Sequence, residues 1–506
     1  MKDINEVLAL QDINQKIYYL KRGRKTELPD AVGLYNDWNP NRHEIITDKV
    51  KYPDIKIVTE PARDEFDDKS GKTVHIEAKK KTVEANRIAL PLEQDICNIH
   101  TAFTVGIEPK MDCEPDGDEQ ALFSALKQVL KTNKIKYQNK RIVRSWLSEQ
   151  ECAEYWYVVK DNGFWSKLKR KVAALFGHSM PEYRLKSTIW SPFRGDTLYP
   201  FFNEEGDLVA FSREYKKKDI EGNIHECFMT VTTEKVYQWD TSNGHEEQHE
   251  FTHGFKKLPV IYCYRQESYC EKIKTLRVRL EKLLSNYADC IDYHFFPILM
   301  LFGRVEQLSG EFKNRIVNLL GENANAQYLT WNQVPETVKF EAETLTNQIY
   351  TMTNTPRISF DTLRGTGNAL SGVAFDYVFL ATHLAVRNHA EVIGEFMQRR
   401  VNFLVDALGA LNTSLEEAAK TIDIDVDIVP YRLDNIDDMV STAVKAVSGG
   451  VWSQKHGILF AGNQDRIEEE LEQIQKEQEE RQQQEIEKER QMSQFRRNNA
   501  LYTNSK

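Results

Sequence analysis

The most constraining stretch of the sequence runs over 341–408, where two helical segments flank a loop that contains glycine. The first segment ends before Pro356, because proline lacks the backbone N–H that a continuing helix needs. Gly365 and Gly367 in the loop tolerate backbone conformations that other residues resist. Apolar residues then recur at three- and four-residue spacing, and an unbroken helix over 371–408 would be about 55 Å long. A helix of that length is typical of a subunit that spans an assembly.

The charge of the chain argues against a protein whose whole surface binds nucleic acid. The 506 residues carry a formal net charge of -10 at pH 7, whereas proteins that coat DNA present basic surfaces to its phosphates. An acidic chain remains compatible with a channel through which DNA slides, because weak adhesion helps sliding.

Cysteine usage and hydropathy predict the compartment. The seven cysteines are scattered and no pair has CxxC spacing, which favours reduced, partly buried thiols. The N-terminus lacks the apolar core of a signal peptide, and no run of about 18 apolar residues occurs. We therefore expect a protein of the cytoplasm or of a particle, without a membrane partner.

Hydrophobic periodicity changes along the chain and predicts an α+β fold with a long central helix and an antiparallel β meander. Helical spacing predicts helices over 3–20, 83–107, 121–130, 140–147, 273–291 and 435–447, with two more that begin near Ser453 and Asp465. Alternation predicts the strands of the meander at 155–159, 198–202, 208–212, 227–231 and 236–239, and 258–261 closes that sheet. Short strands at 298–302, 326–331 and 337–340 surround a small helix over 311–320. A charged hairpin tip is expected at 63–73, a β-like segment at 422–429, and a disordered tail from about Met492.

No stretch satisfies a catalytic, metal or cofactor motif. The GKT at 71–73 lacks the preceding glycine and the strand of a phosphate-binding loop. The glycines of 365–372 follow a helix and a proline and do not complete the dinucleotide pattern. His383 and His389 stand six residues apart, a poor spacing for one metal ion, so packed or partly exposed histidines are expected. The sequence predicts no enzyme, no cofactor and no metal.

Two basic segments and the charges of the long helix each leave two interpretations open. The segment 131–144 could contact nucleic acid, although a solvated helix face is favoured. The segment 164–172 could bind a membrane surface, although an inserted surface helix is favoured. Arg387 with Glu391 and Glu395 with Arg399 have the i,i+4 spacing of ion pairs. Those four side chains could pair within the helix or contact a neighbouring subunit. In the same helix Gly394 predicts a kink, because glycine weakens a helix interior.

In their order along the chain, four motifs resemble those of the portal proteins of tailed, double-stranded DNA bacteriophages. The resemblance covers about 83–480 and rests on 86–89 with 101–106 (NRIA and TAFTVG), 258–261 with 285–289 (LPVI and SNYAD), 371–375 (SGVAF), and 447–453 with 468–471 (VSGGVWS and EEEL). The first is similar to an early family helix, the second to the start of the stem, the third to the start of the long wing helix, and the last to a C-terminal segment. Their order on matching elements carries the resemblance.

The resemblance implies an elongated fold of several parts. The wing is expected at 1–258 and 373–430, the stem at 259–296 and 341–355, the clip at 297–340, the tunnel loop at 356–372, the crown at 431–480 and a polar tail at 481–506. The basic segment 164–172 has no counterpart in this scheme.

It also implies function and partners. Such a protein forms a homo-oligomeric ring, expected here as a dodecamer, at one capsid vertex of the virion, and is assembled in the host cytoplasm. Double-stranded DNA passes through its tunnel during packaging and ejection, and the expected partners are the terminase large subunit, the head-to-tail adaptor, and the major capsid and scaffolding proteins.

Candidate site residues follow from the same mapping. The DNA-facing candidates are Arg357, Arg364, Gly365, Thr366, Gly367 and Asn368; those of the clip, where motor and adaptor dock, are Glu311, Lys313, Arg315, Asn323 and Asn325; Arg387, Glu391, Glu395 and Arg399 are candidates for contacts between subunits.

Two other classes of protein stay open from the sequence. A nuclease or ATPase of the packaging apparatus would need a phosphate loop or a carboxylate cluster for two metal ions. A monomeric helical scaffold or adaptor would need neither. Ring formation separates both from a portal.

Overall fold

The structure is a computed structural model, which describes residues 3–60, 62–67, 71–160, 183–240, 248–294, 298–308, 317–329, 335–357, 378–431, 436–460 and 467–503. It divides into two compact units. Unit 1 comprises Met1–Arg357 and Ala381–Tyr431, and unit 2 comprises Ile358–Leu380 and Arg432–Lys506. Helices and antiparallel sheets together confirm the predicted α+β class.

The predicted meander is present in unit 1 as a five-stranded antiparallel sheet with the order β12-β11-β10-β9-β8. Its strands are β8 (Thr197–Phe202), β9 (Leu208–Lys218), β10 (Ile224–Thr232), β11 (Lys235–Asp240) and β12 (Gln248–Thr252). Gly206 and Gly222 lie in the turns of two of its hairpins with φ of 97° and 98°, a region that glycine enters without strain. These turns connect β8 to β9 and β9 to β10.

A second, three-stranded sheet has the order β13-β6-β7, from β6 (Glu151–Lys160), β7 (Tyr183–Trp190) and β13 (Val260–Tyr264). The expectation that 155–159 and 258–261 belong to the sheet of the meander was therefore wrong. Alternate residues of β6 explain the arrangement: Tyr155 packs in a cluster with the meander, and Trp156 packs in a cluster with helices. A strand that is buried on both faces separates two layers.

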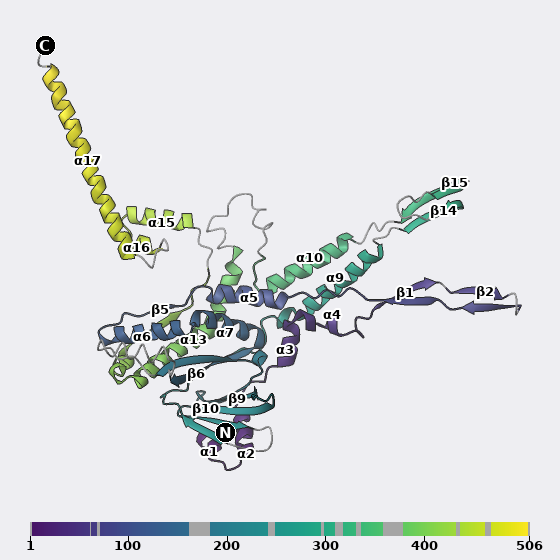
Figure 1. Cartoon of the computed structure of the whole chain (residues 1–506), viewed down its shortest axis with the longest axis horizontal. Coiled ribbons are helices and arrows are strands. Elements are labelled where there is room, and N and C mark those ends of the chain that lie inside the picture. Colours follow the sequence, from purple (N-terminus) through teal and green to yellow (C-terminus); the bar gives the residue numbers. More distant parts are fainter. Residues whose placement is uncertain are drawn as a thin grey trace. The chain divides into compact units, whose positions relative to one another are not determined.

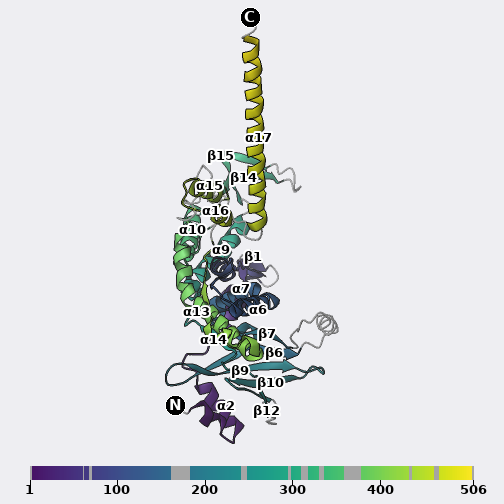
Figure 2. The same ribbon diagram turned by 90° about the vertical axis from the view of Figure 1, so that its left-hand side faces the viewer.

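Two N-terminal helices cover the other face of the meander, as Figures 1 and 2 show. Ile4 and Val7 of α1 (Ile4–Leu8) and Leu20 of α2 (Ile13–Arg22) share a core with Phe228 and Trp239 of the sheet. The single helix expected over 3–20 is two helices. Asp12 begins the second one by accepting a hydrogen bond from the backbone N–H of Asn14, as N-cap residues do.

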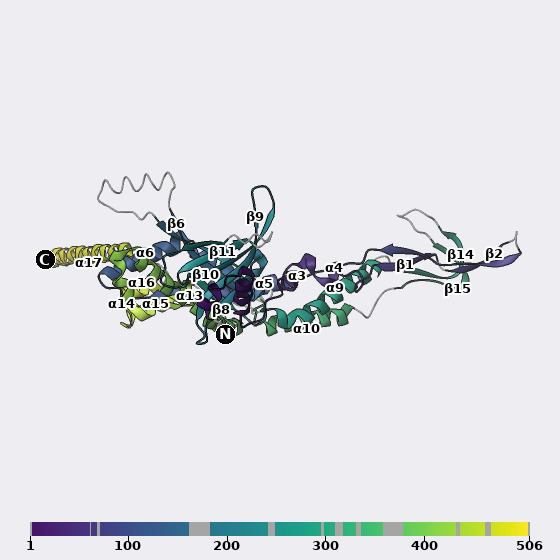
Figure 3. The same ribbon diagram turned by 90° about the horizontal axis from the view of Figure 1, so that it is seen from below.

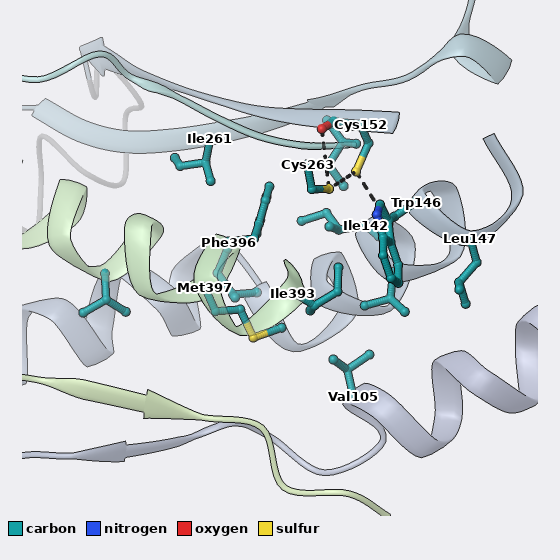
Figure 4. Close-up of a cluster of buried hydrophobic side chains, with 14 of the residues drawn as sticks. Val105, Ile142, Trp146, Leu147, Cys152, Ile261, Cys263, Ile393, Phe396 and Met397 are labelled. Carbon is teal, nitrogen blue, oxygen red and sulfur yellow. Dashed lines mark hydrogen bonds between the residues drawn. The ribbon is translucent and has the colours of Figure 1, made fainter. Parts of the chain in front are cut away.

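The main core lies between the three-stranded sheet and a layer of helices (Figure 4). This layer contains α5 (Leu92–Val105), α6 (Asp118–Thr132), α7 (Ile135–Glu149) and the 32-residue α13 (Leu380–Leu411). The helix expected over 83–107 begins only at Leu92, after Pro91, and ends before Gly106 as predicted. The long helix is described from Leu380, after a turn at Phe379, and residues 371–377 of the predicted helix lie outside the described residues.

Unit 1 also contains a helix pair and two long hairpins (Figures 1 and 3). The pair is α9 (Lys274–His294) and α10 (Pro335–Met352), which an Arg279–Glu341 ion pair joins. One hairpin pairs β14 (Ile298–Leu308) with β15 (Val317–Leu329). The other pairs β1 (Ile55–Glu60) with β4 (Lys79–Val83) and β2 (Arg63–Asp67) with β3 (Lys72–Ile76), which confirms a hairpin at 63–73.

The predicted elements of 298–340 need two corrections. Residues 337–340 are not a strand, because Pro335 at the first position starts α10, a place where proline fits a helix. Residues 317–320 of the predicted small helix belong to β15 and pair with 304–308 of β14, and 311–316 lie outside the described residues.

The remaining elements are short in unit 1 and helical in unit 2. Unit 1 also contains α3 (Ala31–Trp38), η1 (Pro40–Arg42), α4 (Glu44–Thr47), η2 (Pro192–Arg194), η3 (Glu271–Ile273), η4 (Thr413–Leu415), α14 (Ala418–Thr421), and β5 (Lys110–Asp112) paired with β16 (Asp425–Asp427). Unit 2 contains α15 (Ile436–Ser448), α16 (Gln454–Phe460) and α17 (Ile467–Thr503). The backbone N–H of His456 donates to Ser453 Oγ, which confirms that Ser453 caps α16. Helix α17 continues to Thr503, although disorder was expected from about Met492. Among the described residues, no helix is long and apolar enough to cross a membrane.

Candidate functional site

The central feature of the candidate site is the place where the chain leaves the body of unit 1 after α10 and returns to it in α13. Asn354 follows α10 with φ of 49°, a left-handed conformation that asparagine adopts more readily than most residues. Its carbonyl oxygen accepts a hydrogen bond of 2.7 Å from Thr382 Oγ1 in the first turn of α13. The two ends of the intervening segment are therefore tied together.

A buried polar cluster holds the outgoing end. His100 Nε2 lies 2.9 Å from the carbonyl oxygen of Thr353 and 3.1 Å from Thr355 Oγ1. The hydroxyl of Tyr269 donates to the same Thr353 oxygen at 2.6 Å. Because a carbonyl oxygen only accepts, His100 carries its proton on Nε2, and its buried Nδ1 has no hydrogen-bond partner. This bond pattern makes Nε2 of His100 the hydrogen-bond donor.

His389 of α13 packs against this group. Its ring centre lies 5.3 Å from that of His100, 5.3 Å from Tyr269 and 5.4 Å from Trp146. Burial lowers the pKa of His100 to about 4 and that of His389 to about 3. Both histidines are thus uncharged at neutral pH. We call His100, Tyr269, Thr353, Thr355, Thr382 and His389 the loop-anchor cluster.

Some of the predicted tunnel-loop residues belong to the described part of the chain, and the others lie outside it. Arg357 is exposed, and its guanidinium donates to Asn347 Oδ1 of α10 at 3.0 Å. Arg364, Gly365, Thr366, Gly367 and Asn368 lie outside the described residues. The structure thus describes only the start of the predicted loop, up to Arg357, next to the loop-anchor cluster.

The predicted docking residues of the clip are placed only in part. Asn325 is exposed on β15, opposite Phe302 of β14, whose side chain is 46% exposed. Asn323 lies on β15, and Glu311, Lys313 and Arg315 lie outside the described residues. The assignment of a docking surface to this hairpin stays a prediction.

The charges of the long helix behave in two ways. Arg399 and Glu395 are exposed and form the expected ion pair. Arg387 and Glu391 are also exposed, but within the described part of the chain no ion pair joins them. Arg387 and Glu391 remain candidates for contacts between subunits.

Sequence reasoning missed the neighbouring Arg400, which is buried. Its Nε lies 2.6 Å from Glu154 Oε2 of β6, and its Nη1 donates to Asn139 Oδ1 of α7 at 2.7 Å. These contacts fix α13 to the three-stranded sheet and to α7.

A second buried charge group fixes the start of α9. Arg277 lies 2.8 Å from Asp37, 2.6 Å from Glu93 and 3.7 Å from Glu281, and His43 Nδ1 lies 2.6 Å from Glu281. Burial raises the pKa of Glu93 to about 7, although Arg277 opposes this shift. The described residues contain no group of three His, Cys, Asp or Glu side chains able to hold a metal ion. The ion pairs of Arg277 with Asp37 and Glu93 connect α9 with α3 and α5.

The helix pair, the segment anchored at both its ends and the long helix occur in the order that the resemblance predicts for a portal subunit. The chain belongs to the family described as "Phage portal protein, SPP1 Gp6-like", whose model matches residues 20–484. Members of this family are structural proteins of the capsid.

No curated protein matches the chain. Among solved structures, the chain is similar to one from "Virion of native gene transfer agent (GTA) particle", with 10% sequence identity and a TM-score of 0.35 over 73% of this chain and 88% of that chain.

Proposed function

We propose that this portal protein assembles into a dodecameric ring at one capsid vertex and conducts double-stranded DNA through its tunnel during packaging and ejection. The portal function and the capsid-associated ring follow from the family. The subunit number and the path of the DNA are the proposal.

The parts of the ring are assigned to the observed elements. The two-sheet body with α5, α7 and α13 forms the wing, α9 and α10 form the stem, and the β14–β15 hairpin forms the clip. Helices α15 and α16 and the first part of α17 form the crown. The stem assignment is supported by the pairing of α9 with α10 through Arg279 and Glu341, since two packed helices are stiffer than one.

The single observation that carries the tunnel assignment is the hydrogen bond between Thr382 and Asn354. Because both ends of the segment are fixed to the body at one place, everything between them forms a loop with a common root. In this proposal, Arg364 belongs to the tunnel loop and faces the lumen. Few cations at the constriction suit sliding, because each phosphate that a protein neutralises strengthens binding.

The partners are assigned by the same scheme. The clip hairpin docks first to the terminase large subunit and later to the head-to-tail adaptor, and the wing contacts the major capsid and scaffolding proteins. Assembly takes place in the host cytoplasm. The portal performs no catalysis, because the motor supplies the work of packaging.

Cross-linking during packaging tests the path of the DNA. A photo-reactive amino acid replaces Arg364 in one variant and the exposed Lys256 in a matched control, and packaging is stalled with DNA in transit. We expect cross-links to DNA from position 364 at least ten times more often than from position 256. Equal cross-linking from the two positions would contradict the tunnel assignment while leaving membership of the portal family intact.

A further inference from the structure

Four of the seven cysteines form two facing pairs. Cys152 Sγ lies 3.4 Å from Cys263 Sγ, and Cys97 Sγ lies 3.9 Å from Cys270 Sγ. Each of the four side chains is at most 5% exposed. A disulfide bond is about 2.05 Å long, so modest side-chain movement would bring either pair to bonding distance.

The backbone supports a bond in the first pair. Cys263 of β13 and Cys152 of β6 are direct partners in the antiparallel ladder, and Figure 4 shows their side chains directed toward each other. Opposed residues in such a ladder have Cα atoms about 4.5–5.5 Å apart. That range lies within the range found in disulfides, about 4.4–6.8 Å, so no strand has to move.

The second pair borders a cavity. A space of about 20 Å³ is lined by Cys97, Cys270 and neighbouring side chains that include Glu93 and Ser148. One water molecule needs about 10–15 Å³ of such space. A small oxidant of nearly that size, such as hydrogen peroxide, therefore has room beside these two thiols.

The two pairs bracket one connector. Residues 263–270 lead from β13 to the start of α9, and a partner cysteine of the body faces each end. Within it Tyr269 donates to the Thr353 carbonyl oxygen of the loop-anchor cluster, and its backbone N–H donates to the Leu147 carbonyl oxygen at 2.8 Å. Covalent bonds at both ends would fix the connector that carries Tyr269.

We propose that Cys97–Cys270 and Cys152–Cys263 are oxidative modification sites, at which peroxide converts the thiols to disulfides and locks the connector 263–270 to the body. Virion surfaces meet oxidising surroundings, in which disulfides persist, whereas thiols of the cytosol stay reduced. The portal is made with four free thiols at these positions and is locked after the particle leaves the cell. The proposal uses only the capsid location and is independent of the path of the DNA.

The reaction balances with peroxide as oxidant. One thiolate attacks a peroxide oxygen, so that an S–O bond forms, the O–O bond breaks, and the leaving hydroxide takes a proton to become water. The second thiolate then attacks the resulting sulfenic acid, so that the S–S bond forms and a second water leaves. Both sulfurs are oxidised and both peroxide oxygens are reduced. Burial raises the pKa of Cys152 well above its ordinary value, so the reactive thiolate is scarce at neutral pH and oxidation of this pair is slow there but accelerates as pH rises.

Mapping of disulfides in the full-length protein tests the proposal. The Cys290→Ser variant removes the exposed cysteine and leaves six. The assembled protein is treated with hydrogen peroxide and alkylated under denaturing conditions, and its unreduced peptides are identified by mass spectrometry. We expect free thiols to fall from six to two, with linked peptides Cys97–Cys270 and Cys152–Cys263, and a reductant to restore all six.

A matched variant separates the pairs. In Cys290→Ser with Cys270→Ser, only the Cys152–Cys263 link forms and three thiols of the remaining five stay free. Six free thiols after oxidation of the first variant, links between other cysteines, or sulfonic acids without links would each overturn the proposal.

Discussion

At the scale of single residues, buried charged side chains hold α13 in place. The side chains of Arg400 and Glu154 are 3% and 0% exposed, and each is the other's ionic partner. Removal of one member of a buried pair leaves an uncompensated charge, which is costly, whereas replacement of both by apolar residues is often tolerated. This asymmetry distinguishes a buried pair from a surface one.

The pair gives the first prediction. Arg400→Met lowers the free energy of unfolding by about 3–5 kcal/mol, and the double variant with Glu154→Met recovers most of that loss. The matched control is Arg399→Met, whose exposed pair with Glu395 contributes at most about 1 kcal/mol. Urea titrations of the four proteins measure these differences. A loss in Arg400→Met no larger than that in Arg399→Met would contradict a buried ionic role.

The loop-anchor cluster gives a prediction for pH. The pKa of His389 in the folded state, about 3, is below its ordinary value of 6.5, so the unfolded chain binds more protons between these values. Stability contributed by neutral His389 is therefore lost as pH falls below 6.5, by up to about 1.4 kcal/mol per pH unit. His100 acts in the same direction, and Arg265 and Lys272 add nearby positive charge.

Comparison of variants isolates this contribution. Glu93 acts in the opposite direction, because its raised pKa of about 7 makes the folded state bind more protons above pH 4.5. We therefore expect His389→Phe to gain stability relative to the natural protein as pH falls from 6.5 to 5, and the exposed-residue control His75→Asn to gain none. Melting temperatures across this pH range measure the gain; parallel curves for His389→Phe and the natural protein would contradict the account.

At the scale of elements, α13 runs through Gly394 without interruption. Among the described residues outside the backbone of this helix, a Cβ added there would meet only Ile428 Cδ1, at 4.0 Å, so Gly394→Ala removes the flexibility of glycine without a clash. We expect a stabilisation of up to about 1 kcal/mol in urea. At Gly409 of the same helix, a Cβ would lie 2.7 Å from Ala419 Cβ, so Gly409→Ala is destabilising. Destabilisation by Gly394→Ala would instead support the kink that the sequence predicts.

Local patterns predicted most elements, because periodicity reports which faces are buried. The strands of the meander, helix α9 and the capped helix after Ser453 follow from such patterns. Pairing between residues far apart in the chain does not follow from local patterns: residues 317–320 form a strand because they pair with β14. Residues 337–340 alternate like a strand but belong to the helix that begins at Pro335.

The candidate site was less accessible to sequence reasoning than the elements. The glycines and Pro356 predict a loop whose central residues lie outside the described part of the chain. The groups at its two ends come from α5, the residues that follow α10, α13 and the connector before α9. No spacing in the chain relates His100 to Thr353 or Arg400 to Glu154. The threonines of 351–355 were the one local signal, since their hydroxyls suit the polar end of a helix.

At the scale of the whole molecule, the chain is a portal subunit in which a hydrogen bond from Thr382 Oγ1 to Asn354 joins the two chain ends that flank the predicted tunnel loop. The family establishes the portal function. The loop-anchor cluster fixes the chain on both sides of the predicted tunnel loop, and the buried charge groups fix α9 and α13 to the body. The passage of DNA along this loop is the proposal.

The most direct test of this central claim is a cryo-electron microscopy reconstruction of the purified protein. The account predicts a closed ring whose narrowest part is formed by 356–372, with Arg364 within about 16 Å of the axis, two Debye lengths at physiological salt. A monomer, or a ring with Arg364 farther than that from the axis, would contradict it.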